Sequence, residues 1–125
     1  MWKILIVDDQ PAVRELVRVT LEVGNYQIFS AENGQQALDI AQTEHPDIIL
    51  LDIKMPGSTV SGLEVCRYLK GDPATADIYI IIISASVQKD DIEAGVIAGA
   101  NDYFTKPFSP IALINKIEHV IEAHR

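Results

Sequence analysis

Short apolar runs alternate along the chain with longer segments in which apolar residues recur every three or four positions. Runs of this length predict strands, and the three-to-four-residue recurrence predicts helices. The first, third and fourth runs are nearly unbroken Ile, Leu and Val, a pattern typical of strands that are covered on both faces. The five runs span residues 4–7, 28–31, 48–51, 78–83 and 103–104.

Five segments with helical periodicity follow these runs, and turn residues mark most of their ends. The first begins at Pro11 and stops before Gly24, since proline is favoured in the first turn of a helix and glycine after the last. Asn33 and Gln36 form a candidate capping pair for the second. The fourth carries Gly95, and an interior glycine costs about 1 kcal/mol relative to alanine. The helices are expected over about 11–23, 33–44, 62–70, 88–98 and from 109 onwards.

Strand and helix therefore alternate five times in 125 residues, a (βα)5 arrangement in a chain too short for a closed eight-stranded barrel. This alternation predicts one α/β domain, residues 1–125, with an open, parallel, doubly wound five-stranded sheet and helices on both faces. Ligands bind such sheets outside the carboxyl ends of the strands, where the winding reverses. The residues that follow the strands are therefore the candidates for chemistry.

Composition narrows the possible partners. Ten Lys and Arg against 18 Asp and Glu give a net charge of −8 and a pI near 4.7. This charge argues against a nucleic-acid or anionic membrane surface, because phosphate groups attract positive charge. The single cysteine, Cys66, has no partner for an internal disulfide, so a reducing compartment is expected. The first apolar run is too short for a signal peptide, and we expect a cytoplasmic protein with no membrane contact.

Charged and hydroxyl side chains stand at the ends of four predicted strands. The first strand runs into Asp8 and Asp9, and the third ends at Asp52. If these strands are neighbours, three carboxylates meet in one crevice and repel one another unless they are protonated or bridged by a cation. Oxygen ligands alone favour Mg²⁺. With Ser84 and Lys106 opposite, the set predicts a phosphoryl-transfer site with Asp52 as nucleophile.

Four stretches, KILIVDD, DIILLDIKMPG, IIIISA and DYFTKPF, occur in this order along the chain. Together they resemble the signature stretches of the response-regulator receiver domain of two-component signalling, and the resemblance covers essentially the whole chain. It implies a flavodoxin-like fold with strand order 2-1-3-4-5. The implied function is a phosphorylation-dependent switch that assists only its own phosphorylation and dephosphorylation.

The resemblance also assigns the phosphoacceptor and the metal ligands. Asp52 would accept a phosphoryl group from a phosphohistidine of a sensor kinase or phosphotransfer protein. Asp9, with Asp8 assisting partly through water, would hold Mg²⁺ beside Asp52, and the backbone carbonyl of Lys54 would complete the protein ligands. The side chain of Lys54 and that of Ser86 stand where the family varies its residues and tunes the lifetime of the phosphorylated state.

A second group of residues would bind the phosphoryl group and relay its presence. Lys106 would pair with it, preceding a cis peptide bond to Pro107, and Ser84 would move in to donate a hydrogen bond. Tyr103 matches the aromatic residue whose inward turn accompanies that movement. The face formed by the fourth helix, fifth strand and fifth helix is then expected to carry the readout, as a homodimer contact or as a site for an attached or separate output domain.

One departure from the family lies next to the site. The segment 55–62 is about two residues longer than the usual loop between the third strand and the third helix. Access to the site, or the docking of a partner, is therefore expected to differ from the family norm.

Two other functions share this topology. An Asp-nucleophile phosphatase of the haloacid-dehalogenase type needs a second Asp two residues after the nucleophile, where this chain has Lys54. A flavin-binding protein needs a hydroxyl-rich phosphate loop after the first strand, where the chain continues Asp8, Asp9, Gln10 and Pro11. The charged residues at positions 89–93 are expected to form only a solvated helix start.

Overall fold

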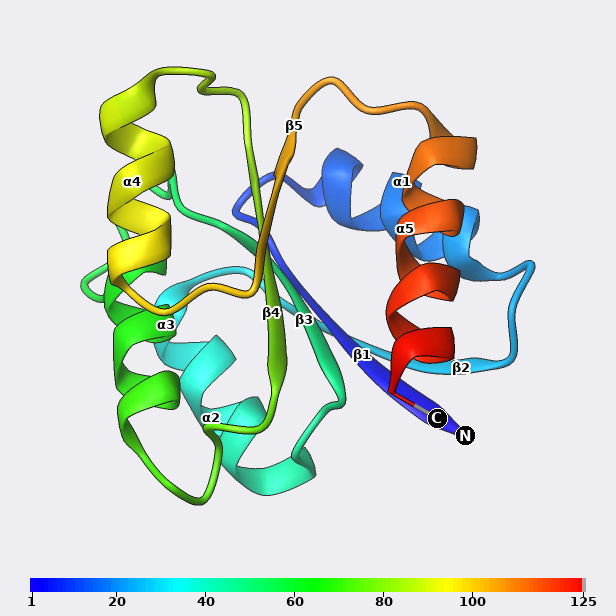
Figure 1. Ribbon diagram of the computed structural model, residues 1–125, viewed down its shortest axis with the longest axis horizontal. Coiled ribbons are helices and arrows are strands. Elements are labelled where there is room, and N and C mark those ends of the chain that lie inside the picture. Colours follow the sequence, from blue (N-terminus) through cyan, green and yellow to red (C-terminus); the bar gives the residue numbers. More distant parts are fainter. Residues whose placement is uncertain (125) are drawn as a thin grey trace.

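The computed structural model describes residues 1–124, in which strands and helices alternate along the chain (Figure 1). All ten predicted elements are present, with boundaries within two residues of those expected. No helix in the described range is long and apolar enough to cross a membrane. The elements are β1 Trp2–Val7, α1 Pro11–Leu21, β2 Tyr26–Ala31, α2 Gly34–Glu44, β3 Ile48–Asp52, α3 Gly62–Gly71, β4 Tyr79–Ser84, α4 Lys89–Ile97, β5 Asp102–Thr105 and α5 Pro110–Ala123.

The five strands form one parallel sheet in the order β2-β1-β3-β4-β5. The predicted open, doubly wound α/β fold is therefore confirmed, together with the strand order that the resemblance implied. Helices α1 and α5 cover one face of the sheet, and α2, α3 and α4 cover the other (Figure 1). The winding reverses between β1 and β3, which places the carboxyl ends of these two strands side by side.

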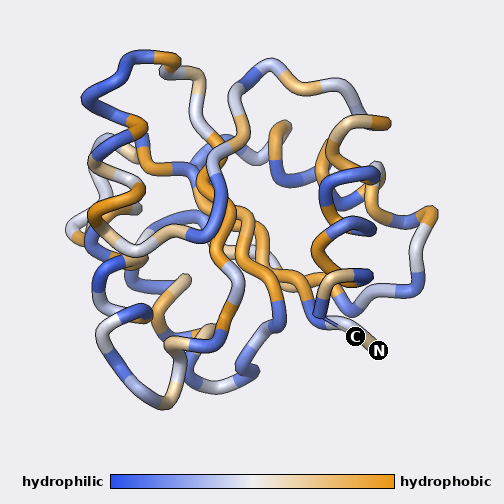
Figure 2. The backbone as a smooth tube through the Cα atoms, viewed as in Figure 1, coloured by the Kyte–Doolittle hydropathy of each residue, from blue (hydrophilic) through white to orange (hydrophobic). Residues whose placement is uncertain are grey.

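The central strands bury both of their faces. In β1, Ile4 and Ile6 join the core beneath α1 and α5, whereas Leu5 and Val7 join the core beneath α2 and α3. All four side chains are at most 2% exposed, and burial of each stabilises the fold by about 1.5–3 kcal/mol. Figure 2 shows these hydrophobic strands running through the interior. Cys66 packs into the core beneath α2 and α3, and burial raises the pKa of its thiol to about 11.

Side-chain caps fix the starts of α2 and α3. Asn33 accepts a hydrogen bond from the Gln36 amide at 2.9 Å, as predicted. The Gln36 side-chain oxygen accepts from the amide of Glu32 rather than from that of Asn33, so the capping pair spans one more residue than expected. Helix α3 has a full capping box of Ser61 and Glu64, which the Ser-x-x-Glu spacing could have predicted.

Glycine allows two helices to approach the sheet closely. A Cβ atom on Gly95 of α4 would lie 2.8 Å from Ile82 Cδ1, so the residue that weakens this helix also lets it pack against β4. A Cβ atom on Gly62 would lie 2.5 Å from the Asp52 carbonyl oxygen and 2.6 Å from Ile53 Cα. The start of α3 therefore rests directly on the backbone of the residue that ends β3.

We predict that Gly62→Ala destabilises the fold by about 1–3 kcal/mol, because backbone atoms must move to admit the methyl group. Gly71→Ala is the matched control, since nothing lies within 4 Å of its added Cβ atom and alanine favours helix. Urea unfolding of both variants measures the difference. Equal stability of the two variants would show that the contact between α3 and Asp52 is not close in solution.

Candidate functional site

Three carboxylates converge at the carboxyl ends of β1 and β3. Val7 pairs with Leu51 in the sheet, so the residues that follow them, Asp8 and Asp52, lie next to each other. Their exposed fractions are 3% and 6%, and Asp9 is the least buried of the three. One oxygen from each carboxylate lies within 4.8 Å of the others. The predicted convergence of these residues is therefore present.

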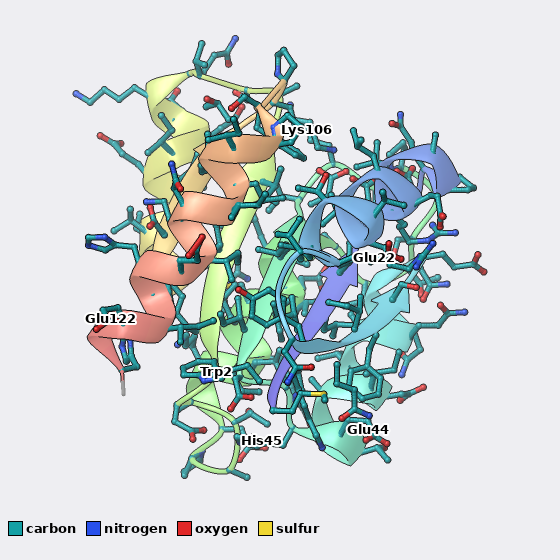
Figure 3. All side chains as sticks on the ribbon, turned by 90° about the vertical axis from the view of Figure 1, so that its right-hand side faces the viewer. Trp2, Glu22, Glu44, His45, Lys106 and Glu122 are labelled. Carbon is teal, nitrogen blue, oxygen red and sulfur yellow. The ribbon has the colours of Figure 1, made fainter. Side chains whose placement is uncertain are left out.

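Lys106 and Ser84 reach the same edge from β5 and β4. Ser84 pairs with Thr105, and the amide of Lys106 donates to the Ser84 carbonyl at 2.8 Å. The Lys106 ammonium donates to Asp8 Oδ2 at 2.7 Å and lies 3.5 Å from Asp52 Oδ2. Its bond to Pro107 is cis, as the resemblance implied. Figure 3 shows Lys106 at the end of the molecule opposite Trp2, so the site occupies one end of the sheet.

Burial and the neighbouring charges shift two pKa values in the cluster. Burial raises the pKa of the Asp52 carboxyl, and the charge of Asp8 adds to this effect, whereas the Lys54 amide and Lys106 oppose it. Burial by itself lowers the pKa of the Lys106 ammonium, but its hydrogen bond to Asp8 and the charges of both carboxylates outweigh that effect and raise the pKa. Lys106 therefore stays cationic at neutral pH. The charged form of Asp52 is destabilised by its burial.

Backbone contacts hold both buried carboxylates in place. Asp8 Oδ1 accepts from the Gln10 amide at 2.9 Å, and Asp52 Oδ1 accepts from the Lys54 amide at 3.0 Å. The Arg14 guanidinium of α1 donates to the Asp8 carbonyl at 2.6 Å. Arg14 was not a sequence candidate, because a single Arg on a helix carries no distinguishing pattern. It ties the start of α1 to the end of β1.

Ser84 follows the β4 residue that pairs with Asp52 in the sheet, and it contacts the β4–α4 turn. Its side chain is fully buried, and its hydroxyl oxygen accepts from the Ser86 amide at 3.2 Å. The Tyr103 hydroxyl donates to the Ser86 carbonyl at 3.1 Å, and its half-buried ring lies near Gly95 of α4. Tyr103 therefore points inward in this structure. Ser86 also donates to Asp91, so Asp91 makes a specific contact in addition to its place in the expected helix start.

The long loop between β3 and α3 contacts the start of α2. Met55 is buried at its base, with 6% exposed. The Ser58 hydroxyl accepts from the Gly34 amide at 3.0 Å and donates to the Val60 carbonyl at 2.6 Å. The loop is thus fixed to the neighbouring helix, and a hollow of about 260 Å³ lies between it and Asp9. The Lys54 side chain, 61% exposed, projects from the start of this segment.

Comparisons with known proteins agree with this geometry. Residues 4–118 match the response regulator receiver domain family. The chain is 45% identical over 118 residues to the phosphate regulon transcriptional regulatory protein PhoB of Pseudomonas aeruginosa, covering 94% of this chain and 51% of the relative. It is 40% identical over 119 residues to the transcriptional regulatory protein ResD of Bacillus subtilis, covering 95% and 48%. The chain therefore spans about half the length of these relatives.

Solved structures show the same likeness in three dimensions. The signal receiver domain of a DNA-binding response regulator from Colwellia psychrerythraea superposes with a TM-score of 0.89 at 30% identity, covering 98% of this chain and 99% of that one. The comparisons do not support the phosphatase or the flavin-binding alternative. With its strand order and its cluster of carboxylates facing a lysine, the chain belongs to the receiver domain family of two-component response regulators.

Proposed function

We propose that this domain, residues 1–125, accepts a phosphoryl group on Asp52 from a phosphohistidine of a sensor kinase or phosphotransfer protein. A carboxylate oxygen of Asp52 attacks phosphorus as the P–N bond breaks, and the imidazole leaves with the bonding electron pair. One observation carries the proposal: Asp8, Asp9 and Asp52 present oxygens within 4.8 Å of one another, facing the Lys106 ammonium. Nucleophile and charge stabilisation are thus provided at one point.

The donor set fits Mg²⁺. It consists of carboxylate oxygens, with no imidazole or thiolate among them, and Mg²⁺ prefers oxygen ligands and keeps positions free for water or phosphate oxygens. Asp9, Asp8 and Asp52 would hold the ion together with the backbone carbonyl of Lys54. When bound, the ion neutralises charge on the phosphoryl oxygens.

The surrounding side chains bind the transferred group. Lys106 keeps its charge, since its pKa is raised, and can exchange its contact with Asp8 for a phosphoryl oxygen. Ser84 accepts a hydrogen bond from the Ser86 amide, which leaves the hydroxyl proton of Ser84 available to a phosphoryl oxygen. Lys54 and Ser86 border the site and are candidates for setting the lifetime of the phosphorylated state.

The surface beside the site suits a protein donor. An apolar hollow of about 360 Å³ borders Lys106, between the first turns of α1 and Phe108. Leu16 of α1 lines this hollow and is 52% exposed, and Val19 of the same helix is 48% exposed. Apolar surface next to a reacting group favours a protein partner over a small molecule. A reducing, cytoplasmic location, which fits the lone buried thiol, would hold such a partner.

The readout would lie on the face formed by α4, β5 and α5. The strand residue before Ser84 pairs with Asp52 in the sheet, and Ser84 and Tyr103 both contact Ser86. A change at Asp52 would therefore reach α4 and β5 along this path. Ile97 on α4 and Ile111 on α5 are 83% and 70% exposed, which suits a homodimer contact or a partner site. Because the relatives are named as transcriptional regulators, we propose that the output, attached or separate, acts on transcription.

A small phosphoryl donor such as acetyl phosphate should label Asp52 alone, and only when Mg²⁺ is present. Intact-mass measurement should then show one added phosphoryl group. Asp52→Ala should abolish the label, whereas Asp47→Ala, at the opposite end of β3, should retain it. Labelling that survives Asp52→Ala would refute the assignment of the phosphoacceptor.

Without metal, Asp52→Asn should melt above the wild type by roughly 3–6 °C, which corresponds to relief of about 1 kcal/mol of charge repulsion. The pKa of Asp52 is raised in the folded protein, so its charge destabilises the fold above that pKa. The advantage of the variant should therefore shrink as the pH falls through that raised pKa, and it should vanish below the ordinary pKa of about 4, where the carboxyl is protonated in both states.

Excess Mg²⁺ binds the folded state and should raise the wild-type melting temperature. The difference in melting temperature between Asp52→Asn and the wild type should therefore become smaller. Thermal melts of both proteins in chelator and in Mg²⁺ measure these four values, with Asp47→Asn as a charge-matched control. A variant that melts below the wild type in chelator would identify Asp52 as a structural residue.

Beryllofluoride with Mg²⁺ imitates a phosphoryl group and should shift the NMR signals of α4, β5 and α5 as well as those around Asp52. The expected pattern follows from the contacts of Ser84 and Tyr103 with Ser86. Asp52→Ala serves as the unresponsive control. Shifts confined to the loops next to Asp52 would place the readout elsewhere.

A further inference from the structure

Ser86 is the point where the two side chains of the proposed switch meet. Its amide donates to Ser84 Oγ at 3.2 Å, and its carbonyl accepts from the Tyr103 hydroxyl at 3.1 Å. Both contacts use the backbone of Ser86, so they form together only when this residue occupies one position. Whatever holds Ser86 therefore also fixes the hydroxyl of Ser84 and the inward direction of Tyr103.

Asp91, in the first turn of α4, holds the side chain of Ser86. The Ser86 hydroxyl donates to Asp91 Oδ2 at 2.5 Å and accepts from the Gln88 amide at 3.2 Å. A hydroxyl that both donates and accepts is fixed in rotation, and a carboxylate is a stronger acceptor than a neutral group. The Asp91 side chain is 33% exposed, and the Lys54 ammonium lies 3.8 Å from the same oxygen.

Asp90, next to Asp91, shows that a place at the start of a helix does not by itself explain the contact with Ser86. Asp90 shares the first turn of α4 and so has a similar interaction with the helix dipole. Within the described residues the exposed side chain of Asp90 makes no hydrogen bond or ion pair, whereas the Asp91 side chain reaches across the turn to Ser86. Comparing variants of these two residues therefore distinguishes a general effect of negative charge at the helix start from a specific effect of anchoring Ser86.

We propose that Asp91 is a positioning residue for the switch: by anchoring Ser86 it stabilises the arrangement in which Tyr103 points inward and the Ser84 hydroxyl is bound to the Ser86 amide. This inference rests on the proposed function, because it assigns a role within that same site. Loss of the Asp91 carboxylate frees the Ser86 turn, so the Tyr103 hydroxyl loses a fixed acceptor. The inward arrangement then becomes less populated, and ligands that need it bind more weakly.

The test compares Asp91→Ala, Asp91→Asn and Asp90→Ala in binding of beryllofluoride with Mg²⁺. Asp91→Ala should bind about threefold to tenfold more weakly than the wild type, the range expected for a partly exposed charged hydrogen bond. Asp91→Asn keeps an acceptor oxygen and should recover most of the affinity, while Asp90→Ala should match the wild type. Equal binding by all three variants, or equal weakening by Asp90→Ala, would overturn the proposal.

A second measurement needs no ligand. In metal-free protein, NMR signals of the Tyr103 ring and the Ser86 amide should move in Asp91→Ala and stay in place in Asp90→Ala, with the rest of the spectrum retained as evidence of folding. Unchanged signals in Asp91→Ala would also overturn the proposal.

A double-mutant cycle with Tyr103→Phe separates this role from a purely local one. If Asp91 acts through Ser86 on Tyr103, the two losses of beryllofluoride affinity should be less than multiplicative in the double variant. Fully multiplicative losses would contradict the coupling. A wild-type protein that fails to bind beryllofluoride, or an Asp52→Ala variant that binds it, would instead refute the proposed function itself.

Discussion

The carboxyl edge of the sheet depends on one ammonium group placed between two buried carboxylates. Burying Asp8 and Asp52 side by side is costly unless their charges are compensated, and Lys106 contacts both. With Asp9 included, three carboxylates and one ammonium leave a formal excess of two negative charges. A divalent cation cancels that excess. Phosphorylation then adds about one negative charge, because an aspartyl phosphate with nearly two charges replaces the single charge of the Asp52 carboxylate. Without a cation the charge compensation is therefore incomplete, and this excess of negative charge is the physical basis for proposing a metal at the site.

Much of this arrangement could be predicted because the strands are so apolar. Runs of Ile, Leu and Val identified β1, β3 and β4, and both faces of these strands are buried as the runs imply. The position of the acidic residues after such strands identified Asp8 and Asp52. That β1 and β3 are neighbours, however, is a property of the winding, which periodicity does not encode. The strand order came from the resemblance, and without it the convergence of the carboxylates stayed conditional.

The site residues that could not be predicted from the sequence make their contacts across turns of the chain. Arg14 binds the carbonyl of Asp8 because α1 folds back over the end of β1, and Asp91 reaches Ser86 because the β4–α4 turn bends toward the first turn of α4. Each contact depends on a backbone direction that residue type does not fix. The capping box of Ser61 and Glu64 is different, since its spacing is a recognised helix-start pattern.

The distribution of burial explains why a change at Asp52 should travel to α4. Only Gly95 is fully buried among the residues of α4, whereas α3 buries four residues and α5 three. A helix with so little buried apolar surface is held weakly and can move at low cost. Its first turn is tied through Asp91 to Ser86, which in turn contacts both Ser84 and Tyr103. The most weakly held helix is thus attached to residues at the carboxyl end of β4. Under the proposed function, a small displacement beside Asp52 would therefore reach α4 rather than be absorbed by the core.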